Sequence, residues 1–250
     1  MRTIDEALAS LPDSNLTPED IARYRAENKT EEEIKIGRGY TILETKLGDN
    51  DIGLYVALKK TDFSLNWNEA LQKVLSEGYI ELTPNQFRDY VIGFKEFFED
   101  KKKLHYADGS EVERGVIESA YEEMFNENKE QRWRAEHLDA IFDEKANMNG
   151  VIIMNYGHRL ENGVPKPLFS EEISDNISSS NGWFNLEDTD RRTGLVTKVN
   201  NTSGEAYFYA PIIGMVSGFS ASSDRAGLVC DEDSGFWGVR LGVRRAKILK

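Results

Sequence analysis

Two short segments near the C-terminal end of the chain, in which inward-type and outward-type residues alternate, constrain the fold most strongly. Residues 219–223 read Phe-Ser-Ala-Ser-Ser, and residues 226–231 read Ala-Gly-Leu-Val-Cys-Asp. A period of two is typical of an antiparallel strand that buries one face. The expected inward positions are Phe219, Ala221, Ala226, Leu228 and Cys230. The expected outward positions are Ser220, Ser222, Gly227, Val229 and Asp231.

Large apolar residues surround these strands on segments that we expect to be loops. They are Ile212, Ile213 and Met215 before the first strand, and Phe236 and Trp237 after the second. Exposed apolar groups that cluster near a chain end mark a contact surface more often than a random surface. A strand pair fixed on one face and free on the other is therefore the predicted binding site. For Ile213 and Trp237 a position inside the core stays open as the alternative.

The predicted binding surface has a displayed set and a scaffold set. The displayed set is Ile212, Ile213, Gly214, Met215, Ser220, Ser222, Gly227, Val229, Asp231, Asp233, Phe236, Trp237 and Arg240. The scaffold set, which we expect to tolerate little change, is Phe219, Ala221, Asp224, Arg225, Leu228, Cys230 and Gly242, joined by Tyr207, Tyr209 and Val243. For Asp224 and Arg225, a half-buried arrangement with backbone hydrogen bonds and an exposed turn both stay open.

The charge of the chain restricts the classes of partner. Its 250 residues carry 44 acidic and 31 basic side chains, a formal net charge of −13. Because binding to a phosphate backbone is largely electrostatic, we expect no nucleic-acid partner. Hydrophobic residues make up 39% of the chain, which favours a globular protein over a disordered one. We interpret the basic residues Arg240, Arg244, Arg245, Lys247 and Lys250 as a surface cluster that pairs with nearby acids.

The single cysteine, Cys230, rules out an intramolecular disulfide, and its inward position predicts a buried thiol rather than a nucleophile. Asp5 and Glu6 stand where a signal peptide would have a basic segment and an apolar run. No apolar run of about 18 residues occurs, so we expect no membrane span. The expected location is the cytoplasm, unless export follows a route that the sequence does not show.

Signals in the first half of the chain are mainly helical. Residues 13–36 carry two helix start signals, and we interpret residues 1–38 as a helical arm. Residues 39–60 predict a hairpin that turns at 48–51. Helices are predicted from Trp67 to a cap at Gly78, from Pro84 onward, and over residues 110–127.

The second half of the chain is richer in strands and loops. We interpret residues 133–145 as helical, and residues 151–156 predict a strand. Residues 160–205 are rich in Asn, Ser and Gly and predict a long connection with short strands at most. Helices early and strands late indicate an α+β fold.

No catalytic constellation is visible in the sequence. His105, His137 and His158 lie far apart, and neither a zinc-binding spacing nor a nucleotide-binding or serine-nucleophile motif occurs. The pairs Asp188 with Asp190 and Asp231 with Asp233 leave loosely held calcium open as an alternative. We expect no metal, no cofactor and no enzymatic activity.

Several segments resemble known proteins. Residues 67–70 (Trp-Asn-Glu-Ala) and 78–87 (Gly-Tyr-Ile-Glu-Leu-Thr-Pro-Asn-Gln-Phe) resemble the first-helix region of bacterial-type C-type lectin-like domains. Residues 133–142, the segment 151–158 and above all residues 219–230 with Leu-Gly-Val-Arg at 241–244 are similar to variable proteins of diversity-generating retroelements, of the archaeal kind. The resemblance covers about residues 40–250.

The resemblance implies a C-type lectin-like fold of the formylglycine-generating-enzyme-like variety in residues 39–250, with a variable ligand-binding region at about 207–244. In that family a reverse transcriptase miscopies adenines, and Asn codons of the AAC and AAT type are favoured targets. Ser, Gly, Val, Asp, Ile and Phe can be reached from those codons, which fits eight displayed residues: Ile212, Ile213, Ser220, Ser222, Gly227, Val229, Asp231 and Phe236. Met215 and Trp237 do not fit and require another template codon.

Departures from related families shape the functional expectation. The calcium-binding Glu-Pro-Asn type of motif of sugar-binding lectins is missing, so the expected partner is an unknown diversified ligand, most simply a protein. Two alternatives stay open. One is a fixed-function enzyme on the formylglycine-generating-enzyme-like scaffold, against which the single cysteine argues. The other is a viral structural or receptor-binding protein. The oligomeric state is left open.

Overall fold

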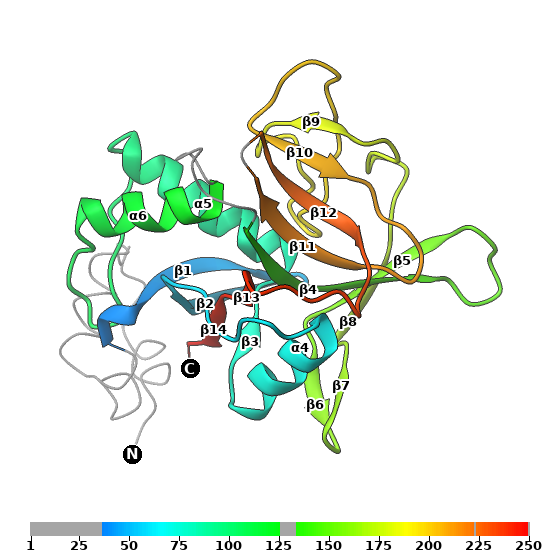
Figure 1. Ribbon diagram of the computed structural model, residues 1–250, viewed down its shortest axis with the longest axis horizontal. Helices are drawn as coiled ribbons and strands as arrows, with labels where there is room; N and C mark the ends of the chain where they lie inside the picture. The colour runs from blue at the N-terminus through cyan, green and yellow to red at the C-terminus, as the bar shows by residue number, and fades with distance from the viewer. Residues whose placement is uncertain (1–36, 126–133, 223, 250) are drawn as a thin grey trace, which may run out of the picture.

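The computed structural model describes residues 37–125, 134–222 and 224–249. Within them, helices and several sheets confirm the predicted α+β class. The described strands form a sheet of four, a sheet of eight and a two-stranded ribbon. Figure 1 shows the C-terminal strands of the larger sheet on one side and helices α5 and α6 on the other. The predicted helical arm lies outside the described residues except for Gly37 and Arg38.

The smaller sheet brings the first and last described strands together. After a short 3-10 turn, η1 (Gly37–Gly39), strands β1 (Tyr40–Leu47) and β2 (Asn50–Ala57) form an antiparallel hairpin, as predicted. Gly48 makes the turn at a φ of 59°, a conformation that glycine adopts readily. Strand β14 (Arg245–Ile248) pairs with β2 and with β3 (Ile80–Glu81), so the order is β1-β2-β14-β3.

The helices begin and end at the signals that the sequence carries. Helix α4 (Trp67–Ser76) starts with a capping box between Asn66 and Glu69, and Gly78 follows its end with a φ of 79°. Helix α5 (Pro84–Phe98) starts with a second capping box at Thr83, and helix α6 (Arg114–Phe125) follows. The three predicted helices are confirmed, although the third begins at Arg114 rather than at residue 110, because Glu111 forms a β-bridge with His105. None of the described helices is both long and apolar enough to cross a membrane.

The larger sheet has the order β8-β5-β4-β11-β12-β10-β9, and β13 also pairs with β4. Its members are β4 (Arg134–Glu144), β5 (Ile152–Tyr156), β8 (Phe169–Glu172), β9 (Gly182–Phe184), β10 (Ala206–Tyr209), β11 (Val216–Ala221), β12 (Ala226–Glu232) and β13 (Leu241–Val243). Strands β6 (Arg159–Glu161) and β7 (Val164–Lys166) form the ribbon. The strand predicted at 151–156 and the short strands expected between 160 and 205 are confirmed.

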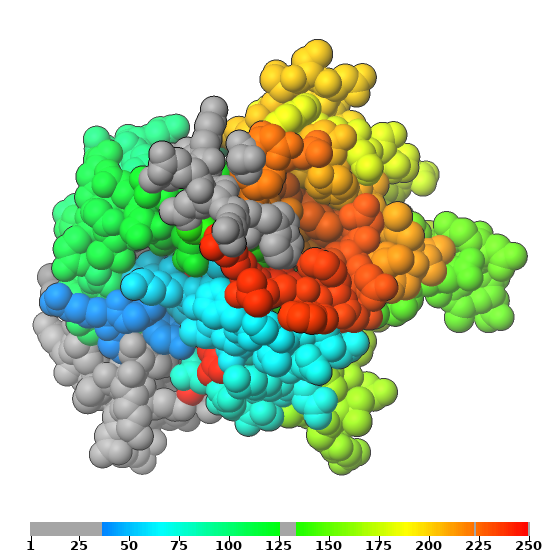
Figure 2. All heavy atoms as spheres, in the orientation of Figure 1, coloured from blue at the N-terminus to red at the C-terminus, as the bar shows by residue number. Residues whose placement is uncertain are grey.

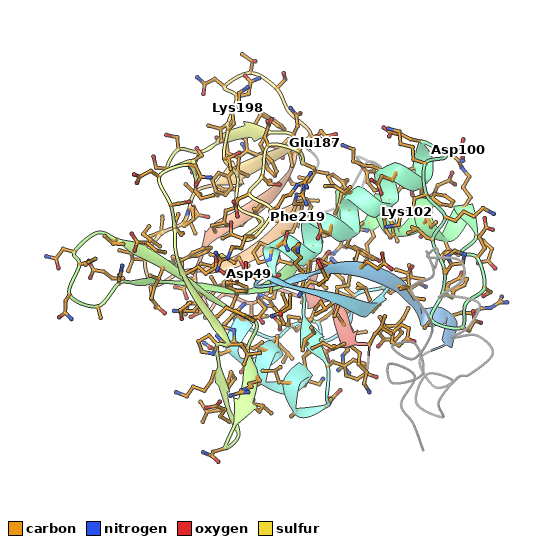
Figure 3. The ribbon with its side chains drawn as sticks, turned by 180° about the vertical axis from the view of Figure 1, so that it is seen from behind. Asp49, Asp100, Lys102, Glu187, Lys198 and Phe219 are labelled. Atoms are coloured by element: carbon orange, nitrogen blue, oxygen red, sulfur yellow. The ribbon has the colours of Figure 1, made fainter. Side chains whose placement is uncertain are left out.

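The main core lies between this sheet and the two later helices. Phe219 of β11 contacts Phe87 of α5, with ring centroids 4.6 Å apart, and Phe125 of α6 at 5.5 Å. Figure 3 labels Phe219 near the middle of the molecule, between the strands and α5. Burying an aromatic side chain of this size contributes roughly 2–3 kcal/mol. The inward face of β11 is thereby fixed against the helices.

The helical interpretation of residues 133–145 is wrong, because residues 134–144 form strand β4 in the middle of the larger sheet. Ala135 to Ala140 are all buried, so both faces of the strand are covered and exposure does not alternate along it. Its polar side chains have partners inside the fold. The Asp139 carboxylate accepts hydrogen bonds from the backbone N–H of His158, at 2.7 Å, and from its imidazole.

The interpretation of the C-terminal basic residues as a surface cluster is wrong for Arg244. Its side chain is buried and donates to Glu136 Oε2 at 3.0 Å and to the carbonyls of Ala57 and Leu58 at 3.1 and 2.7 Å. The expected pairing with acids is confirmed for Arg244 and for Arg245, which donates to both carboxylate oxygens of Asp62 at 2.6 and 2.8 Å, whereas Arg240 forms no ion pair with a described carboxylate. The C-terminal strands are thus held by two bidentate arginines.

Replacing Arg244 with Met tests the buried ion pair. Because the Glu136 carboxylate would stay buried without its partner, we expect a loss of about 3–5 kcal/mol in the free energy of unfolding. Denaturant unfolding measures this change. Arg159→Met removes an exposed ion pair with Glu161 and is the matched control, with an expected loss below about 1 kcal/mol. Equal losses in the two variants would contradict the assigned role of Arg244.

Candidate functional site

The inward and outward faces of β11 and β12 are arranged largely as the alternation predicts. The two strands pair antiparallel, and Phe219 lies opposite Leu228. Phe219, Ala221, Ala226, Leu228 and Cys230 are all buried. Of the outward residues, Ser220, Ser222, Val229 and Asp231 are half-buried.

The expectation that Gly227 is displayed is wrong. Gly227 is buried, and a Cβ there would lie 2.5 Å from the backbone oxygen of Tyr207, closer than real side chains approach. The cause is the parallel pairing of β10 with β12, which sets Tyr207 beside Gly227. Gly227 is therefore a scaffold position. Gly242 is one as well, in agreement with the prediction, since a Cβ there would meet the carbonyl oxygen of Thr61 at 2.8 Å.

Two loops present the large apolar residues at the end of β12. Ile212, Ile213, Phe236 and Trp237 are exposed, the last by 63%, so the alternative of a core position for Ile213 and Trp237 is wrong. Gly214 and Asp233 are also exposed, whereas Met215 and Arg240 are half-buried. Val239, which the sequence did not single out, is 73% exposed.

Backbone hydrogen bonds fix the first loop to the larger sheet and the second loop to the start of α4. The N–H of Ile212 donates to the carbonyl of Cys230 at 3.2 Å, and the N–H of Gly214 donates to Phe142 at 2.6 Å. In the second loop the carbonyl of Ser234 accepts from the N–H of Trp67 at 3.2 Å. In Figure 2 the orange and red atoms of the C-terminal part of the chain form a continuous band beside the cyan atoms of α4. The apolar side chains of the loops are thus presented from anchored backbone.

The turn between β11 and β12 departs from the scaffold prediction. Asp224 and Arg225 are exposed, so the half-buried arrangement is wrong and the exposed turn is correct. The guanidinium of Arg225 lies over the rings of Tyr207 and Tyr209, 4.7 and 5.7 Å from their centroids. These tyrosines are half-buried rather than core residues, and Phe208 between them is the buried member of β10.

Glu232, at the end of β12, is a site residue that the sequence did not reveal. A β-bulge between the pairs Gly218–Val229 and Val216–Glu232 places it on the outward face. Its Oε2 lies 2.7 Å from where a Cβ on Gly218 would stand, so the missing side chain of Gly218 makes room for it. Burial, with a smaller contribution from Asp231, raises the pKa of Glu232 to about 7.

Glu232 makes no hydrogen bond or ion pair with the described residues, and burial also raises the pKa of the adjacent Asp231. Across β11, His137 lies opposite Gly218. Its Nε2–H donates to the carbonyl of Leu65 at 3.2 Å, and burial lowers its pKa to about 4. His137 is therefore neutral at the pH at which Glu232 ionises.

The state of the Cys230 thiol and the arrangement of possible metal ligands bear on the chemistry expected from the sequence. Burial raises the pKa of the Cys230 thiol well above its usual range, in accord with the predicted buried thiol. Among residues that the structure describes, no three His, Cys, Asp or Glu side chains converge as metal ligands. Asp190 of the first acidic pair caps a turn, accepting from the backbone N–H groups of Arg192 and Thr193 at 3.0 and 2.8 Å.

A cleft of about 610 Å³ lies between the β1–β2 hairpin and α5 and contains none of the predicted site residues. Thr45 and Arg88 both bond to the Asp89 carboxylate there, and Lys46 pairs with Asp51 at 2.8 Å. Several charged side chains that line the cleft are thus already paired with other residues of the protein. Lys102, labelled in Figure 3, lines the same cleft beyond the end of α5.

Comparison with protein-family models, with curated proteins and with solved structures finds no match for this chain.

Gly227→Ala tests whether Gly227 is a scaffold position with no room for a side chain. The added methyl must displace the backbone of β10, so we expect a loss of about 1–3 kcal/mol in the free energy of unfolding. Gly115→Ala is the matched control because a Cβ there meets no atom within 4 Å, and its stability should be unchanged or slightly raised. If both variants unfolded at the same denaturant concentration, Gly227 would be a free surface position.

Glu232→Gln tests the half-buried carboxylate. Because the folded-state pKa, about 7, lies above the unfolded value near 4.5, the native protein loses stability as pH rises between these values. We expect the variant to match the native protein at pH 4 and to exceed it by up to about 3 kcal/mol above pH 7. Unfolding measured at both pH values gives the difference. Asp233→Asn, at an exposed neighbour, is the control; a constant difference across pH would contradict the assignment.

Proposed function

We propose that this chain is a non-enzymatic ligand-binding protein of the retroelement-diversified kind, with a C-type lectin-like fold. Its binding surface is formed by the loops 210–215 and 233–240 and by the outward positions of β11 and β12. The observation that carries the proposal is the exposure of Ile212, Ile213, Phe236 and Trp237 on backbone that is anchored to the larger sheet and to the start of α4. Clusters of exposed apolar groups of this kind mark interaction surfaces.

The difference between the core-forming inward residues and the exposed residues of the loops supports diversification of the surface. Inward residues such as Phe219, Leu228 and Cys230 lie in the main core, where large-to-small changes cost about 2–5 kcal/mol. Exposed side chains on the loops contribute little to folding, and substitutions at such positions change stability by about 0.5 kcal/mol or less. A surface of this type accepts many sequences without loss of the fold. Aromatic and aliphatic side chains around a few charges suit a protein ligand.

The state of Cys230 disfavours the alternative of a thiol-dependent enzyme on the same scaffold. Its side chain is fully buried in the main core, and its thiol pKa is raised. A catalytic cysteine needs the opposite environment, an accessible sulfur and a lowered pKa that favours the thiolate. The residue instead serves as a small apolar group under the binding surface.

Deep sequencing of the 3′ end of the gene in its source population tests the proposal. We expect variation at the codons for Ile212, Ile213, Ser220, Val229, Asp231 and Phe236. The codons for Phe219, Gly227, Leu228, Cys230 and Gly242 should be constant, because their side chains are buried or have no room to grow. The codons for β1 and β2 provide the control for background variation. An invariant region, or variation spread evenly over both strand faces, would overturn the diversified reading.

A further inference from the structure

We propose that the ligand of this surface inserts a lysine or arginine side chain against Glu232, beside apolar side chains that pack on Phe236 and Trp237. The inference rests on the proposed function and names the chemistry of the ligand. It follows from a carboxylate that the fold accommodates without giving it a partner.

The position of Glu232 is structurally specified. Gly218, whose Cβ would lie 2.7 Å from Glu232 Oε2, leaves the space that the carboxylate occupies. The β-bulge of β12 turns the side chain to the outward face, next to the loops that carry the exposed apolar residues. Ile212 is bonded through its N–H to Cys230, two residues before Glu232, and Phe236 closes a turn with Asp233, one residue after it. The end of β12 that carries Glu232 is therefore joined by backbone hydrogen bonds to both loops.

The described cations do not neutralise this carboxylate. Arg225 pairs with Asp224 and lies over two tyrosine rings, while Arg244 is bound to Glu136 inside the fold. Arg240, in the same loop as Trp237, forms no ion pair with a described carboxylate. Asp231 and Asp233 flank Glu232 and add negative charge. The surface is thus locally acidic within a chain of net charge −13.

A half-buried carboxylate without a partner is unfavourable when ionised, which is why burial raises its pKa. A guanidinium or ammonium group from a ligand would supply charge-assisted hydrogen bonds and relieve that cost on binding. Trp237 and Phe236 add apolar contact and can hold a cation over their rings. A bound metal ion is a poorer fit, since no three ligating side chains converge in the described chain.

Random linear peptides displayed on phage and selected on the full chain test the proposal. We expect the selected peptides to share a Lys or Arg flanked by apolar residues. Replacing that residue with Gln in a synthetic peptide should weaken binding by about tenfold or more, measured by isothermal titration calorimetry. On the Glu232→Gln protein the same peptide change should have little effect. Glu161→Gln, at a carboxylate on the β6–β7 ribbon, is the control and should keep the full preference.

Trp237→Ala separates this proposal from the proposed function. Its side chain is exposed, so the variant should unfold as the native protein does and yet bind the selected peptides more weakly. Peptides that depend on Trp237 but show no basic preference, or keep it on Glu232→Gln, would overturn the cationic ligand and leave the binding surface standing. Failure to select peptides, or binding that ignores Trp237, would count against both proposals.

Discussion

The ion pair between Arg244 and Glu136 holds the described structure together at its centre. Arg244 follows β13, which pairs with β4, and precedes β14, which pairs with β2. Its guanidinium binds Glu136 of β4 and the carbonyls that end β2, so one side chain joins both sheets. The net stabilisation from a buried pair of this type is modest, because desolvation offsets much of the attraction, but losing one partner is costly. The pair therefore contributes less to the stability of the core than to the position of β13 and β14. Because β13 follows the loop that carries Phe236 and Trp237, the pair also fixes the end of that loop.

The elements that sequence reasoning predicted are those with local signals. The capping residues of α4 and α5, the Gly48 turn and the alternation of β11 and β12 each act within a few residues. Strand β4 has no such signal. It is buried on both faces, and its charged residues Glu136 and Asp139 are paired with Arg244 and His158, far away in the chain. The helical interpretation of this segment is wrong because the distant partners of its charged residues cannot be seen from the sequence.

The candidate site shows the same division between local and distant causes. Its exposed apolar residues and its buried strand faces follow from the local pattern, whereas the errors come from neighbours across the sheet. Gly227 sits on the outward face by parity, yet the parallel approach of Tyr207 leaves no room for a side chain. Glu232 would point inward with Cys230 if the alternation continued, and the bulge reverses it. The alternation of residues along a strand predicts neither the parallel pairing nor the bulge.

Glu232 and Trp237 have a common property under the proposed diversification. Changing the first two bases of AAC or AAT codons produces Asp but never Glu, and Trp is also out of reach. Glu232 and Trp237 therefore cannot be products of these codons, whereas Ile212, Ser220, Val229 and Phe236 can. In copies that carry both residues, the carboxylate and the indole ring would give the surface the same basic and apolar preference, and the residues that vary would select among ligands that satisfy it. Since the carboxylate is destabilising when ionised and unpaired, its presence at this position is easier to explain by binding than by folding.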